Sequence, residues 1–411
     1  MVNSKQKLAP SAPSKRIALL DIFRGFALLG IYMVNIKFMS SSVLHPEAFA
    51  WMSEGPANQF TDWMLANFFN GKFYPIFSFL FGVGFGMQIN KMEEKGSFSA
   101  SFFMRRYFFL MLFGVVHVVF IWGGDVLVLY ALAGFLVLLV RKIPVKYILI
   151  AAILILLFPF YGHLLNYASE WLVAHGHSSL KALREYSYDD IVSLNVDGTI
   201  LDRLKFRLYE YTVYYRNVEY FPTLIFMIFG GYAAGRYKFY NKIPETLSKL
   251  TALAVVALAG ILVWRFLYPR LEYLAKDSFE WYVIFAKLNI ISNIAQSFLY
   301  LYIISFLYEK RVLSRLIEPL AYAGRMSLTN YITQSIIGMI LFSGFYFGLY
   351  GRYNIALLVL ISVVSYVLLI WASKIWTRNF RYGPLEFIWR ELTYKAHLKF
   401  IKTPNNNQKN K

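Results

Sequence analysis

The sequence predicts an all-α, polytopic membrane protein with about ten transmembrane helices and both termini in the cytoplasm. Composition is the first reason, because the chain is 58% hydrophobic and only 16% charged, with a mean hydropathy of +0.47. Soluble domains carry about 25% charged residues. Long, continuously apolar runs are the second reason, and the confinement of positive charge to alternate connections between them is the third.

Each apolar run is long enough for a helix of about 20 residues to cross a hydrocarbon core of about 30 Å. A helix satisfies its own backbone hydrogen bonds in lipid. The runs also far exceed the roughly 10 alternating residues of an outer-membrane strand, so strands are not favoured. In chain order, the predicted spans are 17–39, 66–90, 103–122, 125–141, 146–166, 210–235, 248–268, 282–308, 326–350 and 355–376.

The segments that flank these spans complete the predicted organisation, which has a cytoplasmic N-terminal arm (1–16), a transmembrane bundle (17–376), a cytoplasmic interfacial segment (377–398) and a disordered tail (399–411). No small-residue cleavage site follows the first span, so we expect a retained anchor rather than a signal peptide. The external loop, about 167–209, is expected to be a lid, a partly helical cap or a tolerated insertion.

The net charge of +19 follows from the predicted topology. With the N-terminus inside, the inner segments hold 28 basic residues (Lys and Arg) and 7 acidic residues (Asp and Glu). The rest of the chain holds 14 basic and 16 acidic residues. This is the positive-inside bias, so the charge predicts a lipid bilayer with anionic head groups as the partner and no nucleic acid. The chain has no cysteine, which excludes disulfides and cysteine-ligated metals, and we predict no metal site.

The first span carries an ionisable pair, Asp21 and Arg24, which share one face of a helix because they are three residues apart. Charged groups at depth in a membrane are rare and usually functional. Arg24 is expected either to pin helices together with Asp21 or to grip a phosphate or carboxylate. Asn35 lies three turns further along the same helix and is a candidate to orient a substrate.

The third span contains His117, about 16 Å along the helix from the basic pair Arg105-Arg106. A lone histidine on an apolar helix is either a packing residue or, since imidazole exchanges protons near neutral pH, a general base. The turn Gly123-Gly124-Asp125 follows. Asp125 is expected either to cap the next helix or to orient His117.

Two motifs lie near the predicted inner surface toward the C-terminus. Gly324-Arg325-Met-Ser-Leu-Thr-Asn330-Tyr331 opens the ninth span, and Gln334 lies one turn inside it. Arg325, Asn330 and Gln334 are candidate substrate-binding residues, since positions 327, 330 and 334 share a helix face. In the second motif, Gly383-Pro-Leu-Glu386 with Arg390, an i,i+4 ion pair is expected. Simple anchoring at the interface is the alternative for both motifs.

These four motifs, in this order over residues 15 to 396, resemble the YeiB family of bacterial multi-pass membrane proteins, the domain of unknown function 418. The resemblance implies a bacterial inner (plasma) membrane location. The first motif is also distantly similar to the membrane acyltransferase superfamily, whose members often transfer an acyl group from cytoplasmic acyl-CoA across the membrane. Acyltransferase-3 members have a histidine where this chain has Asn35. The heparan N-acetyltransferase has its histidine in the following external loop, where His45 occupies a broadly similar place.

Three functions follow from these features. In the first, an acyltransferase-like enzyme uses Arg24 to hold the donor and His117 or His45 as a general base. Acyl-CoA would be its donor substrate, with no permanently bound cofactor, and a small molecule or an envelope glycan its acceptor. In the second, the same polar residues line a transport path for a small anionic or amphipathic solute. The third is a non-catalytic scaffold. The sequence predicts no oligomeric state.

Overall fold

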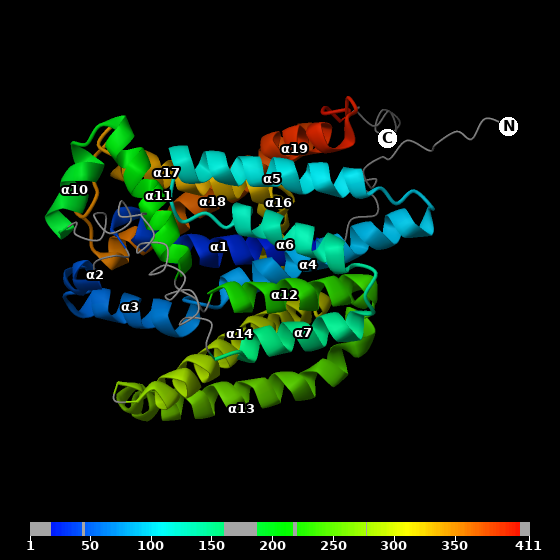
Figure 1. The fold of residues 1–411 in the computed structure, drawn as a ribbon, viewed down its shortest axis with the longest axis horizontal. Coiled ribbons are helices and arrows are strands. Elements are labelled where there is room, and N and C mark those ends of the chain that lie inside the picture. The colour runs from blue at the N-terminus through cyan, green and yellow to red at the C-terminus, as the bar shows by residue number, and fades with distance from the viewer. Residues whose placement is uncertain (1–17, 43–45, 160–186, 217–219, 277, 403–411) are drawn as a thin grey trace, which may run out of the picture.

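The computed structural model describes residues 18–42, 46–159, 187–216, 220–276 and 278–402. In these residues all regular secondary structure is helical, apart from one isolated bridge between Phe380 and Ile401. Most helices are aligned along one axis, as in a membrane bundle (Figure 1). The predicted all-α class is therefore confirmed.

The helices have lengths that range from a single turn to more than eight turns. In chain order they are α1 (Ala18–Ser40), α2 (Pro46–Met52), α3 (Pro56–Phe68), α4 (Phe73–Glu94), α5 (Ala100–Phe120), α6 (Leu127–Val140), α7 (Val145–Leu157), α10 (Tyr188–Val196), α11 (Ile200–Arg216), α12 (Tyr220–Arg236), the 3-10 turn η3 (Phe239–Asn241), α13 (Ile243–Ala275), α14 (Phe279–Glu309), α15 (Ser314–Ile317), α16 (Leu320–Arg325), α17 (Ser327–Phe342), α18 (Ile355–Asn379) and α19 (Pro384–Tyr394).

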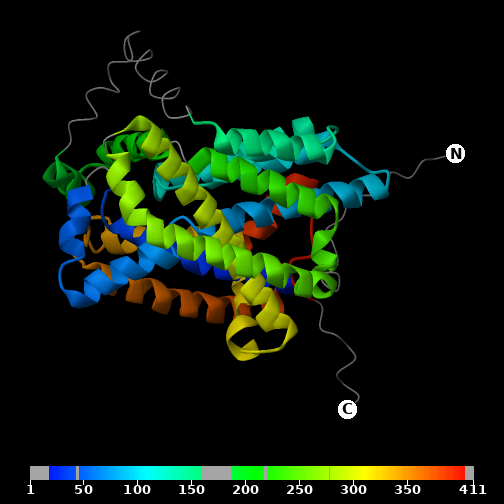
Figure 2. The ribbon, with the colours of Figure 1, turned by 90° about the horizontal axis from the view of Figure 1, so that it is seen from below.

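Five of the described helices are long and apolar enough to cross a membrane: α1, α5, α13, α14 and α18. Helices α6 and α7 are apolar but shorter. The paired helices α13 and α14 run side by side across one face (Figure 2). Much of their apolar surface is exposed, as in a helix that faces lipid. Multiple crossings are thus supported, whereas the predicted number of ten remains a prediction.

Several predicted spans have different boundaries, each with a local cause. The span 66–90 begins later, at Phe73, because α3 ends at Phe68 and Gly71 takes a positive φ of 80° that breaks the helix. The span 210–235 divides between α11 and α12. The span 326–350 ends as a helix at Phe342, and a turn with two left-handed glycines follows it.

Part of the predicted external loop is helical. Ser187 and Asp190 form a reciprocal capping box that starts α10. Thr199 and Asp202 exchange the same hydrogen bonds at the start of α11. The described part of this loop is therefore largely helical, and its role as a lid, a cap or an insertion stays a prediction. Residues 160–186 lie outside the described residues, as do the arm 1–16 and most of the tail.

Glycines bring two helix pairs into backbone contact. A Cβ on Gly231 of α12 would lie 1.9 Å from the carbonyl oxygen of Phe79, and one on Gly82 of α4 would lie 2.0 Å from that of Ile228. These α4 and α12 glycines therefore serve helix packing. Helices α1 and α16 meet in the same way, since a Cβ on Gly324 would lie 1.8 Å from the carbonyl oxygen of Asp21.

The two ends of the bundle differ in character. One end carries the α4–α5, α6–α7 and α12–α13 connections together with α19 (Figure 1). These connections belong to the basic segments that the sequence assigns to the cytoplasm, and we call this the basic end. The short helices α2, α3, α10 and α11 lie at the opposite end (Figure 1).

Candidate functional site

A cavity of about 910 Å³ enters the bundle from the basic end. Along α1 it reaches from Ala18 to Ile31, about 20 Å at 1.5 Å per residue. Its lining contains nine Lys and Arg but only three Asp and Glu: Arg24, Lys91, Lys95, Arg106, Lys238, Arg325, Arg381, Arg390 and Lys402, with Asp21, Glu94 and Glu386. The entrance therefore favours an anion.

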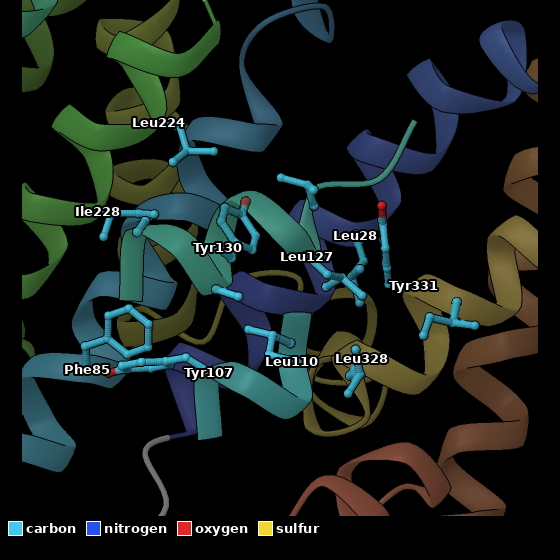
Figure 3. Close-up of a cluster of buried hydrophobic side chains, with 14 of the residues drawn as sticks. Leu28, Phe85, Tyr107, Leu110, Leu127, Tyr130, Leu224, Ile228, Leu328 and Tyr331 are labelled. Carbon is cyan, nitrogen blue, oxygen red and sulfur yellow. The ribbon is translucent and has the colours of Figure 1, made fainter. Parts of the chain in front are cut away.

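The deep part of the cavity is apolar and aromatic. Its wall belongs to the largest buried cluster of the protein and includes Phe85, Leu127 and Tyr130. Figure 3 shows Phe85 and Tyr107 together on one side of this cluster, with Leu28 and Tyr331 on the other. A ligand that fills the whole cavity would thus have an anionic head and an apolar body.

Asp21 joins two arginines beside the cavity. Arg24 Nη1 donates to Asp21 Oδ1 at 2.9 Å, and Arg325 Nε lies 3.6 Å from Oδ2. The close approach of Gly25 and Gly324 brings Arg325 to this carboxylate. All three charged residues line the cavity. The predicted Asp21–Arg24 pair is confirmed, and Arg325 lies with it.

His117 is fully buried behind the deep end of the cavity. Its Nδ1 atom lies 3.1 Å from Asp125 Oδ1, within ion-pair distance but without hydrogen-bond geometry. Neither ring nitrogen has a hydrogen-bond partner within the described chain. The ring of Tyr331, which lines the cavity, is 5.3 Å from the imidazole. His117 itself does not line the cavity, so Tyr331 is the ring that separates the two.

Asp125 caps α6, which is one of the two roles expected from its sequence position. Its Oδ2 atom accepts a hydrogen bond from the backbone N–H of Val128 at 2.9 Å. Its other oxygen, Oδ1, lies 3.1 Å from His117 Nδ1. Orientation of His117 by this carboxylate stays a prediction.

A second, much smaller cavity of about 40 Å³ lies toward the opposite end. Trp122 lines it and also meets the imidazole of His117 edge-on at 6.5 Å. Glu210 and Arg207 supply its charged groups, and Ser42 Oγ donates to Glu210 Oε1 at 3.3 Å. His117 thus lies between the two cavities, one aromatic ring away from each.

Three candidate substrate-binding residues lie elsewhere. Asn330 is buried and donates to the Ala323 carbonyl oxygen and to Ser373 Oγ, both at 3.0 Å, so it joins helices instead of lining the cavity. Gln334 is also buried outside the lining, and its Nε2 atom has no partner in the described part of the chain. Asn35 lies one turn beyond Ile31, where the cavity ends. His45 is outside the described residues.

The Gly383-Pro-Leu-Glu386 motif builds a helix junction. Glu386 accepts hydrogen bonds from the N–H of Leu328 at 2.7 Å, the N–H of Thr329 at 3.1 Å and the Thr329 hydroxyl at 2.6 Å. It therefore caps the N-terminus of α17 from α19. Burial raises the pKa of this carboxyl, and the bonds from Thr329 oppose that rise. The expected ion pair with Arg390 is wrong, because the carboxylate is occupied by α17.

Arg106 and Trp389 also line the cavity, although neither was a candidate from the sequence. Arg106 fits the positive-inside bias and gave no further signal. For Trp389 the signal was its helical spacing from Glu386 and Arg390, which places all three toward one side of α19. In the described residues, no group of three or more His, Asp or Glu could hold a metal ion.

All four sequence motifs meet at this cavity, and comparison with known proteins finds the same family. A family model described as "Protein of unknown function (DUF418)" matches residues 234–396. A relative described as "Uncharacterized protein YxaH" from Bacillus subtilis (strain 168) is 31% identical over 405 residues, covering 94% of this chain and 96% of its own. "Uncharacterized protein YeiB" from Escherichia coli (strain K12) is 24% identical over 409 residues, and the match covers 93% of this chain and 97% of that protein. No solved structure matches significantly. The chain therefore belongs to the DUF418 family of membrane proteins.

Proposed function

We propose that this integral membrane protein is an acyl-transferring enzyme that takes an amphipathic, anionic acyl donor into the basic cavity. The His117–Asp125 pair carries the proposal. A buried histidine 3.1 Å from a buried carboxylate, with neither ring nitrogen hydrogen-bonded in the described chain, can serve as a general base. It lies one ring away from the deep end of a cavity that is large enough for a donor.

The donor enters with its anionic head at the basic end and its acyl group toward Tyr331. Arg24 and Arg325 attract the head, and Asp21 holds both guanidinium groups in place. The aromatic and aliphatic residues of the deep wall receive the apolar part. Acyl-CoA, the donor implied by the distant similarity of the first motif to the membrane acyltransferase superfamily, has this form.

His117 Nε2 takes the proton from an acceptor hydroxyl or amine. The acceptor oxygen or nitrogen then forms a bond to the acyl carbonyl carbon, and the bond from that carbon to the donor's leaving group breaks. The leaving group takes up the proton from His117, so the base is regenerated. Tyr331 must turn aside for the groups to meet. The small cavity beside Trp122 gives an acceptor a second approach, from the opposite end.

The test is transfer of a labelled acyl group from acyl-CoA by purified protein in nanodiscs, with cell-envelope extract as the source of acceptor. Removal of a general base costs about 100- to 10,000-fold in rate, and we expect such a loss for His117→Ala. The matched control is His397→Ala, since His397 is fully exposed. Equal transfer by both variants would refute the role of His117.

Transport of a small amphipathic anion is the second candidate, and the basic entrance is compatible with it. Uptake of a labelled ligand into vesicles without any covalent product would favour transport over transfer. Transfer without net uptake would favour the enzyme.

A further inference from the structure

Two arginines of the cavity, Arg106 of α5 and Arg390 of α19, lack an acidic partner. In the described segments, no carboxylate oxygen lies within 4.0 Å of either guanidinium. The Nε atom of Arg106 is buried and makes no hydrogen bond. Its charged neighbours are Arg390 and Arg24, which repel it. Like charges held close to one another are costly unless an opposite charge offsets them.

The nearby carboxylates are already occupied. Glu386 uses both oxygens at the N-terminus of α17, and Asp21 lies between Arg24 and Arg325. Neither can turn toward Arg106 without leaving its own partners uncompensated. The missing negative charge must therefore come from outside the described chain.

Aromatic rings hold both guanidinium groups in fixed positions. Arg106 stacks on the ring of Trp389 at 3.8 Å, and Trp389 Nε1 donates in return to the Arg106 carbonyl oxygen at 2.8 Å. Arg390 lies over the ring of Tyr382 at 4.8 Å. Stacking occupies the face of a guanidinium and leaves its N–H edge available to oxygen atoms. The contact of Trp389 with Arg106 thus joins α19 to α5, and both guanidinium groups are held in place as hydrogen-bond donors.

We propose that Arg106 and Arg390, on their supports Trp389 and Tyr382, form a phosphate-binding site for the head of the cavity's ligand. A phosphate supplies more negative charge than a carboxylate, and its oxygens can accept from two guanidinium groups at once. The remaining cavity then receives the apolar body of the same molecule. The phosphate belongs either to a soluble nucleotide-type carrier or to a lipid head group. Its place as the head of an acyl donor rests on the proposed function, whereas phosphate binding itself does not.

The test is calorimetric titration of the purified full chain, in nanodiscs of neutral phosphatidylcholine, with inorganic diphosphate. We expect Arg106→Gln and Arg390→Gln each to raise the Kd at least tenfold. Arg378→Gln is the matched control, because it removes the same charge from an exposed position outside the cavity and should leave the Kd within twofold. Arg106→Lys keeps the charge without the planar fork, so we expect an intermediate Kd from a variant that retains the native fold.

Equal weakening by Arg378→Gln and Arg106→Gln would overturn the site, since binding would then follow net charge alone. An unchanged Kd for both Arg106→Gln and Arg390→Gln would overturn it as well. Competition with ADP and with short-chain phosphatidic acid identifies the source of the phosphate, and displacement by neither would contradict a phosphate carried on a larger molecule. His117→Ala should bind diphosphate as the wild type does. Arginine-dependent binding without any acyl transfer would keep this site and reject the proposed enzyme.

Discussion

Substitution of Gly324 by alanine tests whether the approach of α1 and α16 builds the entrance of the cavity. The new Cβ atom would lie 1.8 Å from the carbonyl oxygen of Asp21 and 2.9 Å from the backbone nitrogen of Gly25. Both obstacles are backbone atoms, so no side chain can rotate to relieve the clash. Normal contact needs about 3.5 Å, and the two helices would therefore have to separate by about 1.7 Å.

This separation has two consequences. Overpacking in a tight interface costs about 1–3 kcal/mol, and occasionally more. The Arg325–Asp21 contact, already 3.6 Å long, would also lengthen beyond ion-pair range. Asp21 would then no longer hold the Arg325 guanidinium in position at the entrance of the cavity. We expect a lower Tm and weaker binding of diphosphate.

The assay is thermal unfolding of detergent-solubilised protein, followed by size-exclusion chromatography after heating. Gly260→Ala is the matched control, since a Cβ on that glycine meets no atom within 4 Å. Alanine is favoured over glycine in a helix by about 0.5–1 kcal/mol, so this control should melt at the wild-type temperature or slightly above it. If Gly324→Ala unfolded together with Gly260→Ala, the inferred contact of α1 with α16 would be wrong.

Three further predictions follow from individual contacts. Glu386→Ala removes the side-chain acceptors at the N-terminus of α17 and should lower the free energy of unfolding by about 1–3 kcal/mol. The control is Glu391→Ala on the same helix, which should have the higher Tm. Equal Tm values would argue against the cap. Asp125→Asn keeps an oxygen for the Val128 N–H but loses the charge facing His117, so acyl transfer should fall while Tm changes little, and a large loss of Tm with normal transfer would contradict the role in orientation. Because the chain has no cysteine, a single introduced cysteine shows on which side of the membrane its position lies. A membrane-impermeant thiol reagent should label Lys95→Cys only from the cytoplasm and Gln59→Cys only from outside. Labelling of both from one side would reject the topology.

The sequence was sufficient where a spacing rule determines a contact. Asp21 and Arg24 are three residues apart on a helix, so their pairing follows from helical geometry. Asp125 lies at the turn before α6, where a side-chain cap is expected, and its Oδ2 atom accepts the Val128 N–H.

The sequence was insufficient where a polar residue could face either a cavity or a neighbouring helix. Asn330 and Arg325 belong to one motif, yet Asn330 joins α16 to α18 while Arg325 lines the cavity. Only the tertiary arrangement distinguishes these environments. Arg106 was hidden for a related reason, since the positive-inside bias already accounts for a basic residue at a helix end.

The most direct measurement is an electron cryomicroscopy structure of the protein with a non-hydrolysable acyl-CoA analogue. We expect density for the phosphates at hydrogen-bonding distance from Arg106 and Arg390, with the acyl carbonyl beside a displaced Tyr331. An empty cavity, or an analogue held only on the lipid-facing surface, would contradict it.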